Sequence, residues 1–166
     1  MRVRDVLSEP LKGKRGYLSV KDVRTIIDVD AGLFQQWLAR GQIPFKLKKV
    51  GKRTLRRFPI GDLPRLILIA EIVGHKYGIG DAAANVDLIL NRKYADGSVP
   101  GPILWFPQIR FILFTKATAG GSWSLPKWLR EKDCASCFLL SIQELKRKVE
   151  TALAKLNDKP ETEVGD

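Results

Sequence analysis

The sequence has few of the residues that build catalytic and metal centres. Among 166 residues there is one histidine, His75, and there are two cysteines, Cys134 and Cys137. A Cys-x-x-Cys pair with no further cysteine and no neighbouring histidine does not complete a zinc site, so a structural role is expected, with redox or metal sensing as the alternative. The carboxylates show no spacing typical of a metal-dependent nuclease, and no glycine-rich phosphate loop occurs. We therefore expect no enzyme activity, no cofactor and no metal.

Long apolar runs are also missing. No stretch is long enough to span a bilayer, and the first residues lack the continuous apolar segment of a signal peptide. The longest apolar run, at residues 66–73, is typical of a buried helix. With 45% apolar and 28% charged residues, the composition is that of a globular protein. We expect a cytoplasmic protein that does not contact a membrane.

Acidic residues are scarce in one half of the chain only. Residues 1–76 contain 17 lysines and arginines against 7 acids, whereas residues 77–166 contain 12 against 11. The net charge of +11 is therefore concentrated in the first half, as expected if that half alone meets a polyanion. A membrane surface is the competing polyanion, but the cations do not follow one face of a long amphipathic helix. This distribution favours nucleic acid.

Residues 17–41 carry the signals of two short helices. Ser19 and Asp22 form a capping-box pattern that starts the first helix. Asp30 is placed to cap a second helix from Ala31 to Gly41, where glycine accepts the left-handed conformation. The apolar stripe of the second helix consists of Leu33, Phe34, Trp37 and Leu38. The polar residues left to point outward, toward base edges in a major groove, are Gln35, Gln36 and Arg40.

A strongly basic segment follows Pro44. Apolar and basic residues roughly alternate at 45–58 around Gly51, which predicts a two-stranded wing with its turn near that glycine. The segment contains no acid and seven cations, which are Lys46, Lys48, Lys49, Lys52, Arg53, Arg56 and Arg57. Each cation near a phosphate releases condensed counterions. If about five do so, log affinity should fall against log salt with a slope of roughly −4 to −5.

The order of these motifs resembles that of the MerR family of winged helix-turn-helix proteins, over about residues 17–90. Trp37 stands four residues before Gly41, as an aromatic residue precedes Gly-Leu in the family. Residues 56–58, Arg-Arg-Phe, resemble the Arg-x-Tyr that ends the family's wing, and residues 62–63, Asp-Leu, open the next helix. Residues 78–82 resemble the turn before the family's fourth helix.

This resemblance implies that the second helix enters the major groove and that the wing lies on the phosphate backbone. Two residues depart from the family pattern, because Gln35 stands where an arginine is usual and Phe58 lacks a tyrosine hydroxyl. The family's long dimerisation helix is absent, so its effector sensing and promoter twisting are not implied. The residues expected to contact DNA are Ser19, Gln35, Gln36, Arg40, Lys46, Lys48, Lys49, Lys52, Arg53, Arg56 and Arg57.

The rest of the chain indicates helices at 63–73 and at 82–90, the latter capped by Asp81. Turn formers follow, then β-branched and aromatic runs that predict strands at 103–106, 109–115 and 137–141, and a final helix at 142–156. We expect an α+β fold. Its parts would be a basic N-terminal arm (1–16), a winged helix-turn-helix domain (17–90), a linker (91–102), a small β/α module (103–156) and a disordered tail (157–166).

The final predicted helix is amphipathic, with an apolar stripe at spacings of three and four. The stripe consists of Ile142, Leu145, Val149, Leu153 and Leu156. Two-fold dimers on inverted half-sites commonly supply specificity, so we expect a homodimer held partly by this stripe and completed by the preceding strands. The alternative is that the stripe packs against its own sheet.

Together these patterns predict a bacterial-type, nucleoid-associated transcriptional regulator that binds specific sequences of double-stranded DNA. The β/α module would serve self-association or a protein partner. Two alternatives are an excisionase-like architectural recombination factor and a protein-interaction adaptor built on a winged-helix scaffold.

Overall fold

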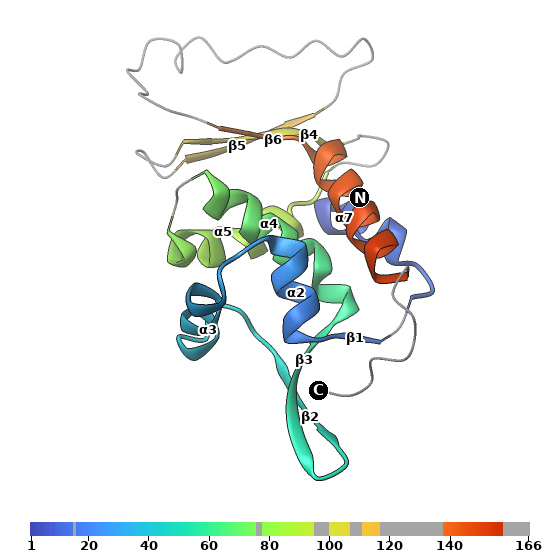
Figure 1. Cartoon of the computed structure of the whole chain (residues 1–166). Helices are drawn as coiled ribbons and strands as arrows, with labels where there is room; N and C mark the ends of the chain where they lie inside the picture. The colour runs from blue at the N-terminus through green and yellow to red at the C-terminus, as the bar shows by residue number, and fades with distance from the viewer. Residues whose placement is uncertain (15, 76–77, 95–99, 107–110, 117–137, 158–166) are drawn as a thin grey trace.

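The chain folds into a mixed α+β structure, as predicted, with helices in the middle and a small antiparallel sheet at each end (Figure 1). The computed structural model describes the chain except for residues 15, 76–77, 95–99, 107–110, 117–137 and 158–166. The helices are α1 (Val3–Leu7), α2 (Val20–Ile27), α3 (Ala31–Ala39), α4 (Leu63–Gly74), α5 (Ile79–Asn91) and α7 (Ile142–Asn157), with short 3-10 helices η1 (Glu9–Leu11) and η2 (Ile60–Asp62). The first sheet, in the order β1-β3-β2, consists of β1 (Tyr17–Leu18), β2 (Lys46–Val50) and β3 (Arg53–Pro59). The second, in the order β5-β4-β6, consists of β4 (Pro100–Phe106), β5 (Phe111–Lys116) and β6 (Phe138–Leu140).

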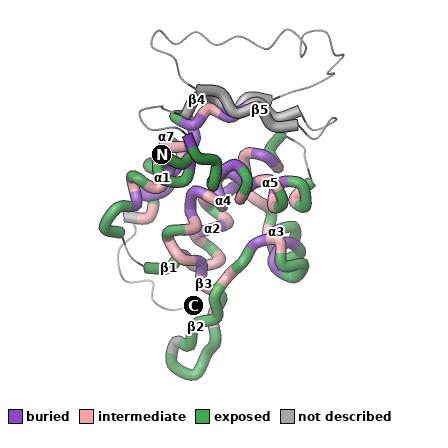
Figure 2. Tube along the Cα trace, turned by 180° about the vertical axis from the view of Figure 1, so that it is seen from behind, coloured by how far each residue is buried: buried purple, intermediate pink, exposed green. Residues whose placement is uncertain are grey.

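Helix α4 is the centre of the core. Its only charged residues are Arg65 and Glu71, and a helix that is apolar on nearly every side has to be surrounded. Helices α2, α5 and α7 all pack against it, and buried residues gather around it in Figure 2. The residues of α4 that are at most 2% exposed are Leu63, Leu66, Leu68, Ile69 and Ile72.

Residues 3–11 belong to the core, which corrects that part of the basic arm expected at residues 1–16. Helix α1 buries Val3 and Leu7, and η1 buries Leu11. The segment is also tied to the end of α5, because the Val3 N–H donates to the Arg92 carbonyl oxygen at 3.3 Å. The three apolar residues recur at a spacing of four, which is the helical signal that the surrounding cations obscured.

Helix α7 packs inside its own chain, which corrects the expectation that its apolar stripe joins two copies. Ile142, Leu145, Val149 and Leu153 are at most 6% exposed, and Leu156 is half-buried. The helix contacts α1 and α4 as well as β4. Because these side chains are already buried within one chain, α7 would have to leave the core to form a dimer through them. Homodimerisation stays a prediction, and it would require another surface.

A single hydrophobic core extends from α1 to α7, although a boundary was expected at residues 91–102. Ile103 of β4 and Leu140 of β6 belong to the same buried cluster as Phe34, Val86 and the α7 stripe. Ile103, Leu140 and helix α7 are therefore packed with the rest of the described chain and not as a separate module.

The predicted helix starts in the first half are confirmed. Ser19 Oγ accepts from the Asp22 N–H at 3.1 Å, and the Ser19 N–H donates to Asp22 Oδ2 at 3.0 Å, so the capping box is complete. At α3, Asp30 Oδ1 accepts from the N–H groups of Gly32 and Leu33 at 2.7 and 3.2 Å. These caps satisfy backbone donors that have no partner within the first turn of a helix.

The glycine end of the second helix is also confirmed, although its last helical residue is Ala39. Gly41 has a φ of 67°, its N–H donates to the Leu38 carbonyl oxygen at 3.1 Å, and the Gln42 N–H donates to that of Trp37 at 3.0 Å. This pair of bonds is the Schellman arrangement. It turns the chain sharply toward the hairpin.

Helix α5 begins at Ile79 with Gly78 at its N-cap, so Asp81 lies in the first turn and not at the cap expected of it. The three predicted strands of the second half are present as β4, β5 and β6. The Cys-x-x-Cys pair at 134–137, the segment 123–132 and the predicted tail from residue 158 onward lie outside the described residues. Within the described part, none of the helices has the length and apolar character to cross a bilayer.

Candidate nucleic-acid interface

Strands β2 and β3 form an antiparallel hairpin whose two-residue turn is Gly51 and Lys52, as predicted. Gly51 has a φ of 60°, and a positive φ in a tight turn matches the twist of the two strands. The hairpin extends away from the helical body next to α3 (Figure 1), and nearly all of it is exposed (Figure 2). Its length places side chains well beyond the core.

The strand register divides the hairpin cations between two faces. Directly opposed residues of antiparallel strands point to the same side, and Leu47 opposes Arg56 while Lys49 opposes Thr54. We call this side, which continues into Phe58 at the base, the inner face. The other side is the outer face, and its cations are Lys46, Lys48, Arg53 and Arg57. Because Lys52 lies at the turn, only part of the predicted set of seven can meet one phosphate backbone at once.

Three phenylalanines join the base of the inner face to α3. The rings of Phe34 and Phe58 lie 6.1 Å apart between centroids, and those of Phe45 and Phe58 lie 6.4 Å apart with an edge-to-face tilt. Phe34 and Phe58 are fully buried. Edge-to-face contacts of this kind add to the free energy gained from burial, so the orientation of the hairpin relative to α3 is fixed by a rigid aromatic cluster.

Arg56 links the hairpin to the polar side of α3. Its Nη1 donates to Gln35 Oε1 at 3.0 Å, and its guanidinium carbon lies 5.1 Å from the centroid of the Phe45 ring. Arginine has no acceptor atom, so the amide of Gln35 has to present its oxygen to Arg56 and its NH₂ group to solvent. The two residues, both exposed, form one composite surface from segments that are distant in sequence.

Gln36 and Arg40 are the other predicted base-reading residues. Both are exposed on α3, and neither side chain has a hydrogen bond or ion pair with any described residue. Their polar groups are therefore available to a ligand. Leu33, which was expected in the apolar stripe, is 42% exposed, because it lies at the edge of the arc that buries Phe34 and Leu38.

Ser19, which was predicted to contact DNA, uses its side chain to cap α2. In addition to its capping role, its hydroxyl donates to Asp22 Oδ2 at 2.7 Å, and the side chain is half-buried. The positive end of α3 is likewise occupied, because the backbone N–H groups of residues 32 and 33 bind the Asp30 carboxylate. These bonds hold the pKa of Asp30 below its usual value, so this helix start is not free to hold a phosphate.

Two side chains of the hairpin region were not predicted to matter. Leu47, on the inner face directly opposite Arg56, is 67% exposed. Tyr17 of β1 lies on the outer face, where the Lys48 ammonium sits 4.4 Å from its ring centroid. Both are large apolar side chains that lie on open faces of the hairpin region.

The described residues contain no group of three or more histidine, cysteine, aspartate or glutamate side chains that could hold a metal ion. The chain matches no model of a known protein family, and no curated protein is significantly similar to it in sequence.

Proposed function

We propose that this protein is a sequence-specific regulator that binds double-stranded DNA, with α3 as the recognition helix and the β2–β3 hairpin as a wing. The observation that carries the proposal is the hydrogen bond between Arg56 and Gln35. It makes the cationic hairpin and the polar side of α3 parts of one exposed surface. A helix with free polar side chains next to a basic hairpin fits the winged helix-turn-helix mode of docking, as the MerR-like motifs also suggest.

Base recognition would come from three side chains of α3. Gln36 and Arg40 are free to pair bidentately, glutamine with adenine and arginine with guanine. Gln35 differs, because its oxygen is held by Arg56 and its NH₂ group remains as a donor. It would therefore favour a base that offers an acceptor in the major groove, such as purine N7 or guanine O6.

Affinity would come from cations that share the side of α3. Lys49 on the inner face and Lys52 at the turn extend the surface that Arg56 begins. Contacts from these residues to phosphates would position the protein without reading sequence. The outer-face cations point away from this surface and would contribute mainly through the long-range field.

A protein-interaction adaptor is the second candidate, and one observation favours it. Leu47 and Leu33 are 67% and 42% exposed, and large apolar side chains on an open surface often mark a protein contact. A Leu47→Ser variant separates the two functions. It should keep its DNA affinity within about threefold if DNA is the ligand, because a single apolar contact contributes little beside charge release.

The test is selection of bound duplexes from a random library by the full chain. We expect an enriched motif, and we expect Gln36→Ala to relax it at one position while binding to random DNA stays nearly intact. Thr25→Ala, on an exposed part of α2, is the matched control and should recover the same motif as the wild type. Absence of any enriched motif, or equal losses by Gln36→Ala on selected and random duplexes, would refute the proposal.

A further inference from the structure

A pocket of about 370 Å³ lies between the C-terminal end of α2, the middle of α4 and the outer side of α7. This volume is in the range of small-molecule sites. Its apolar lining consists of Ile26, Ile27, Ile67, Ala70 and Ala152. Its charged lining consists of Asp28, Glu71, Arg147, Lys148 and Lys155. An apolar floor with a charged rim is suited to an amphipathic ligand.

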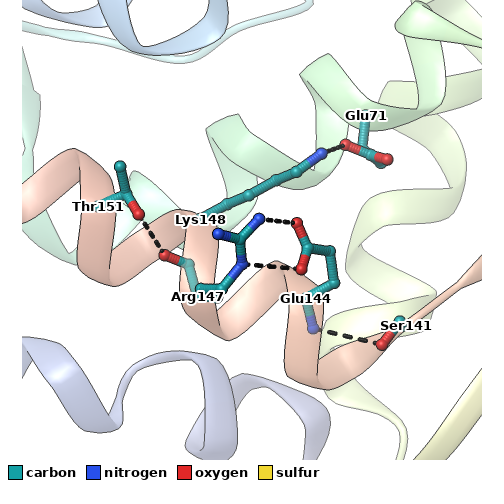
Figure 3. Close-up of polar contacts among 6 residues, drawn as sticks. All are labelled: Glu71, Ser141, Glu144, Arg147, Lys148 and Thr151. Carbon is teal, nitrogen blue, oxygen red and sulfur yellow. Dashed lines mark hydrogen bonds and ion pairs between the residues drawn. The ribbon is translucent and has the colours of Figure 1, made fainter.

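Most of the charges on the rim are already paired, as Figure 3 shows. Lys148 forms an ion pair with Glu71, and the Nε and Nη2 atoms of Arg147 donate to the carboxylate of Glu144 at 2.9 and 2.7 Å. Lys155 and Asp28 form no ion pair with any described residue. Among the described residues, the pocket therefore presents one positive and one negative charge without an ion-pair partner, those of Lys155 and Asp28.

The two free charges belong to different elements. Asp28 follows α2, where the backbone carbonyl groups at the end of the helix add partial negative charge. Lys155 is on α7, along the same side as Arg147, which lies two helical turns before it. One part of the rim thus favours a cationic group and another favours an anionic one.

We infer that this pocket binds a small zwitterion with an apolar body, of the chemical class of an apolar amino acid. Its ammonium group would face Asp28, its carboxylate would face Lys155 and the remaining donors of Arg147, and its apolar part would cover the isoleucine floor. Neither charge has to be released from an existing ion pair when the ligand binds, so the electrostatic gain is not spent on breaking internal contacts.

Occupancy of the pocket would act on α3 through Asp28. This residue has a φ of 50°, and it is the only non-glycine with a positive φ in the described part of the chain. It begins the turn that sets the direction of α3 relative to α2. A ligand that holds the Asp28 carboxylate restrains that turn and so changes DNA affinity, a consequence that rests on the proposed function.

Nuclear magnetic resonance titration of the full chain tests the site without DNA. Phenylalanine is the zwitterionic probe, and 3-phenylpropionate and 2-phenylethylamine are matched probes that each lack one charge. We expect saturable shifts at residues 26–28, 67–71 and 147–155 with phenylalanine at millimolar concentration, and affinity lower by about tenfold for each matched probe. No saturable shifts there, or equal affinity for either matched probe, would overturn the site.

Two variants locate the charges. Asp28→Asn tolerates the left-handed conformation and Lys155→Gln keeps the length of most of the side chain, so both should fold and both should weaken phenylalanine binding about tenfold. Glu150→Gln, exposed on α7 outside the pocket, should leave it unchanged. If both pocket variants bind like the wild type, the assignment is wrong.

A DNA titration with and without phenylalanine tests the coupling separately. We expect at least a threefold change in affinity for the selected duplex. Phenylalanine binding without any change in DNA affinity would overturn the coupling and leave the site. Failure to bind any duplex would refute the proposed function, while the resonance shifts would still decide the site.

Discussion

At the scale of single residues, the chemistry of the interface depends on a contact between Gln35 and Arg56. A donor-only guanidinium fixes which end of the amide faces outward, so a residue of the hairpin determines what a residue of the helix can recognise. The aromatic ring of Phe45 beneath the guanidinium supports this geometry. Under the proposed function, Arg56 would therefore position Gln35 for base recognition in addition to supplying a positive charge.

Arg56→Lys tests this positioning role. Lysine keeps the charge but cannot hold the same planar geometry over Phe45 and onto Gln35. We expect a loss of discrimination of about 1 kcal/mol at the base that Gln35 reads, with nearly unchanged affinity for random DNA. Combining the variant with Gln35→Ala should add little further loss, which a double-mutant cycle in a binding assay would measure. Fully additive losses would contradict the link.

Asp30 gives a pH dependence at the same scale. Its folded-state pKa is lowered chiefly by the backbone N–H of Leu33, with the N–H of Gly32 as the second cause. The stabilisation is therefore present above the usual pKa of an aspartate and is lost as pH falls through the lowered value. Asp30→Asn keeps a capping oxygen but does not titrate. On acidification, the midpoint temperature of its thermal unfolding should fall less than that of the wild type. Equal falls would show that Asp30 is not the source of this pH dependence.

At the scale of elements, the strand register of the hairpin places its cations on two opposite faces. Of the seven cations, Lys49 and Arg56 lie on the inner face, four lie on the outer face, and Lys52 lies at the turn. If only one of these two faces meets DNA, the affinity for DNA should depend less on salt than seven phosphate contacts would imply. The difference arises because strand pairing assigns alternate residues to opposite faces.

Neutralising one face at a time tests this division. Lys49→Gln with Lys52→Gln should reduce the salt slope of DNA binding by about 2, on selected and random duplexes alike. Lys46→Gln with Lys48→Gln removes the same charge from the outer face and should leave the slope almost unchanged. Fluorescence anisotropy over a salt series measures both. Equal reductions by the two pairs would show that the faces are not distinguished by DNA.

For helix α7, the sequence predicted the amphipathic pattern but not the surface against which the apolar stripe packs. An amphipathic stripe looks the same whether it packs on another chain or on its own core. The deciding contacts come from α1 and α4, which are distant in sequence. By contrast, the starts of α2 and α3 and the turn at Gly51 depend on residues a few positions apart, and these were predictable.

The variant Leu145→Asp with Val149→Asp distinguishes the two packings. Both residues are at most 2% exposed within one chain, and an unpaired charge in a core is among the most destabilising changes. We expect the variant to lose its cooperative thermal unfolding transition in circular dichroism. Gln143→Asp, on the exposed side of α7, should stay within about 0.5 kcal/mol of the wild type. A stably folded double variant with only a changed sedimentation coefficient would instead support a dimer that forms through this stripe.

At the scale of the whole molecule, one core joins α1 and α7 to the helices around α4. The 3-10 helix η1 is held to α7 by the ion pair of Glu9 and Lys146, and α7 is held to α4 by that of Glu71 and Lys148. The hairpin and α3 extend from this body at the end opposite the second sheet (Figure 1). The sequence predicted the charge asymmetry and the order of elements, but the closure of the chain on itself requires long-range packing that no local pattern specifies.

The proposed DNA binding is tested most directly by the affinity of the full chain for a selected and a random duplex, measured by fluorescence anisotropy across a salt series. If α3 reads bases and the hairpin contacts phosphates, log affinity falls linearly with log salt with a slope of roughly −2 to −4 on both duplexes. The selected duplex should bind more tightly by about 10³ or more at every salt concentration. No binding of either duplex at low salt, or equal affinities for the two at every salt concentration, would contradict this mode of DNA binding.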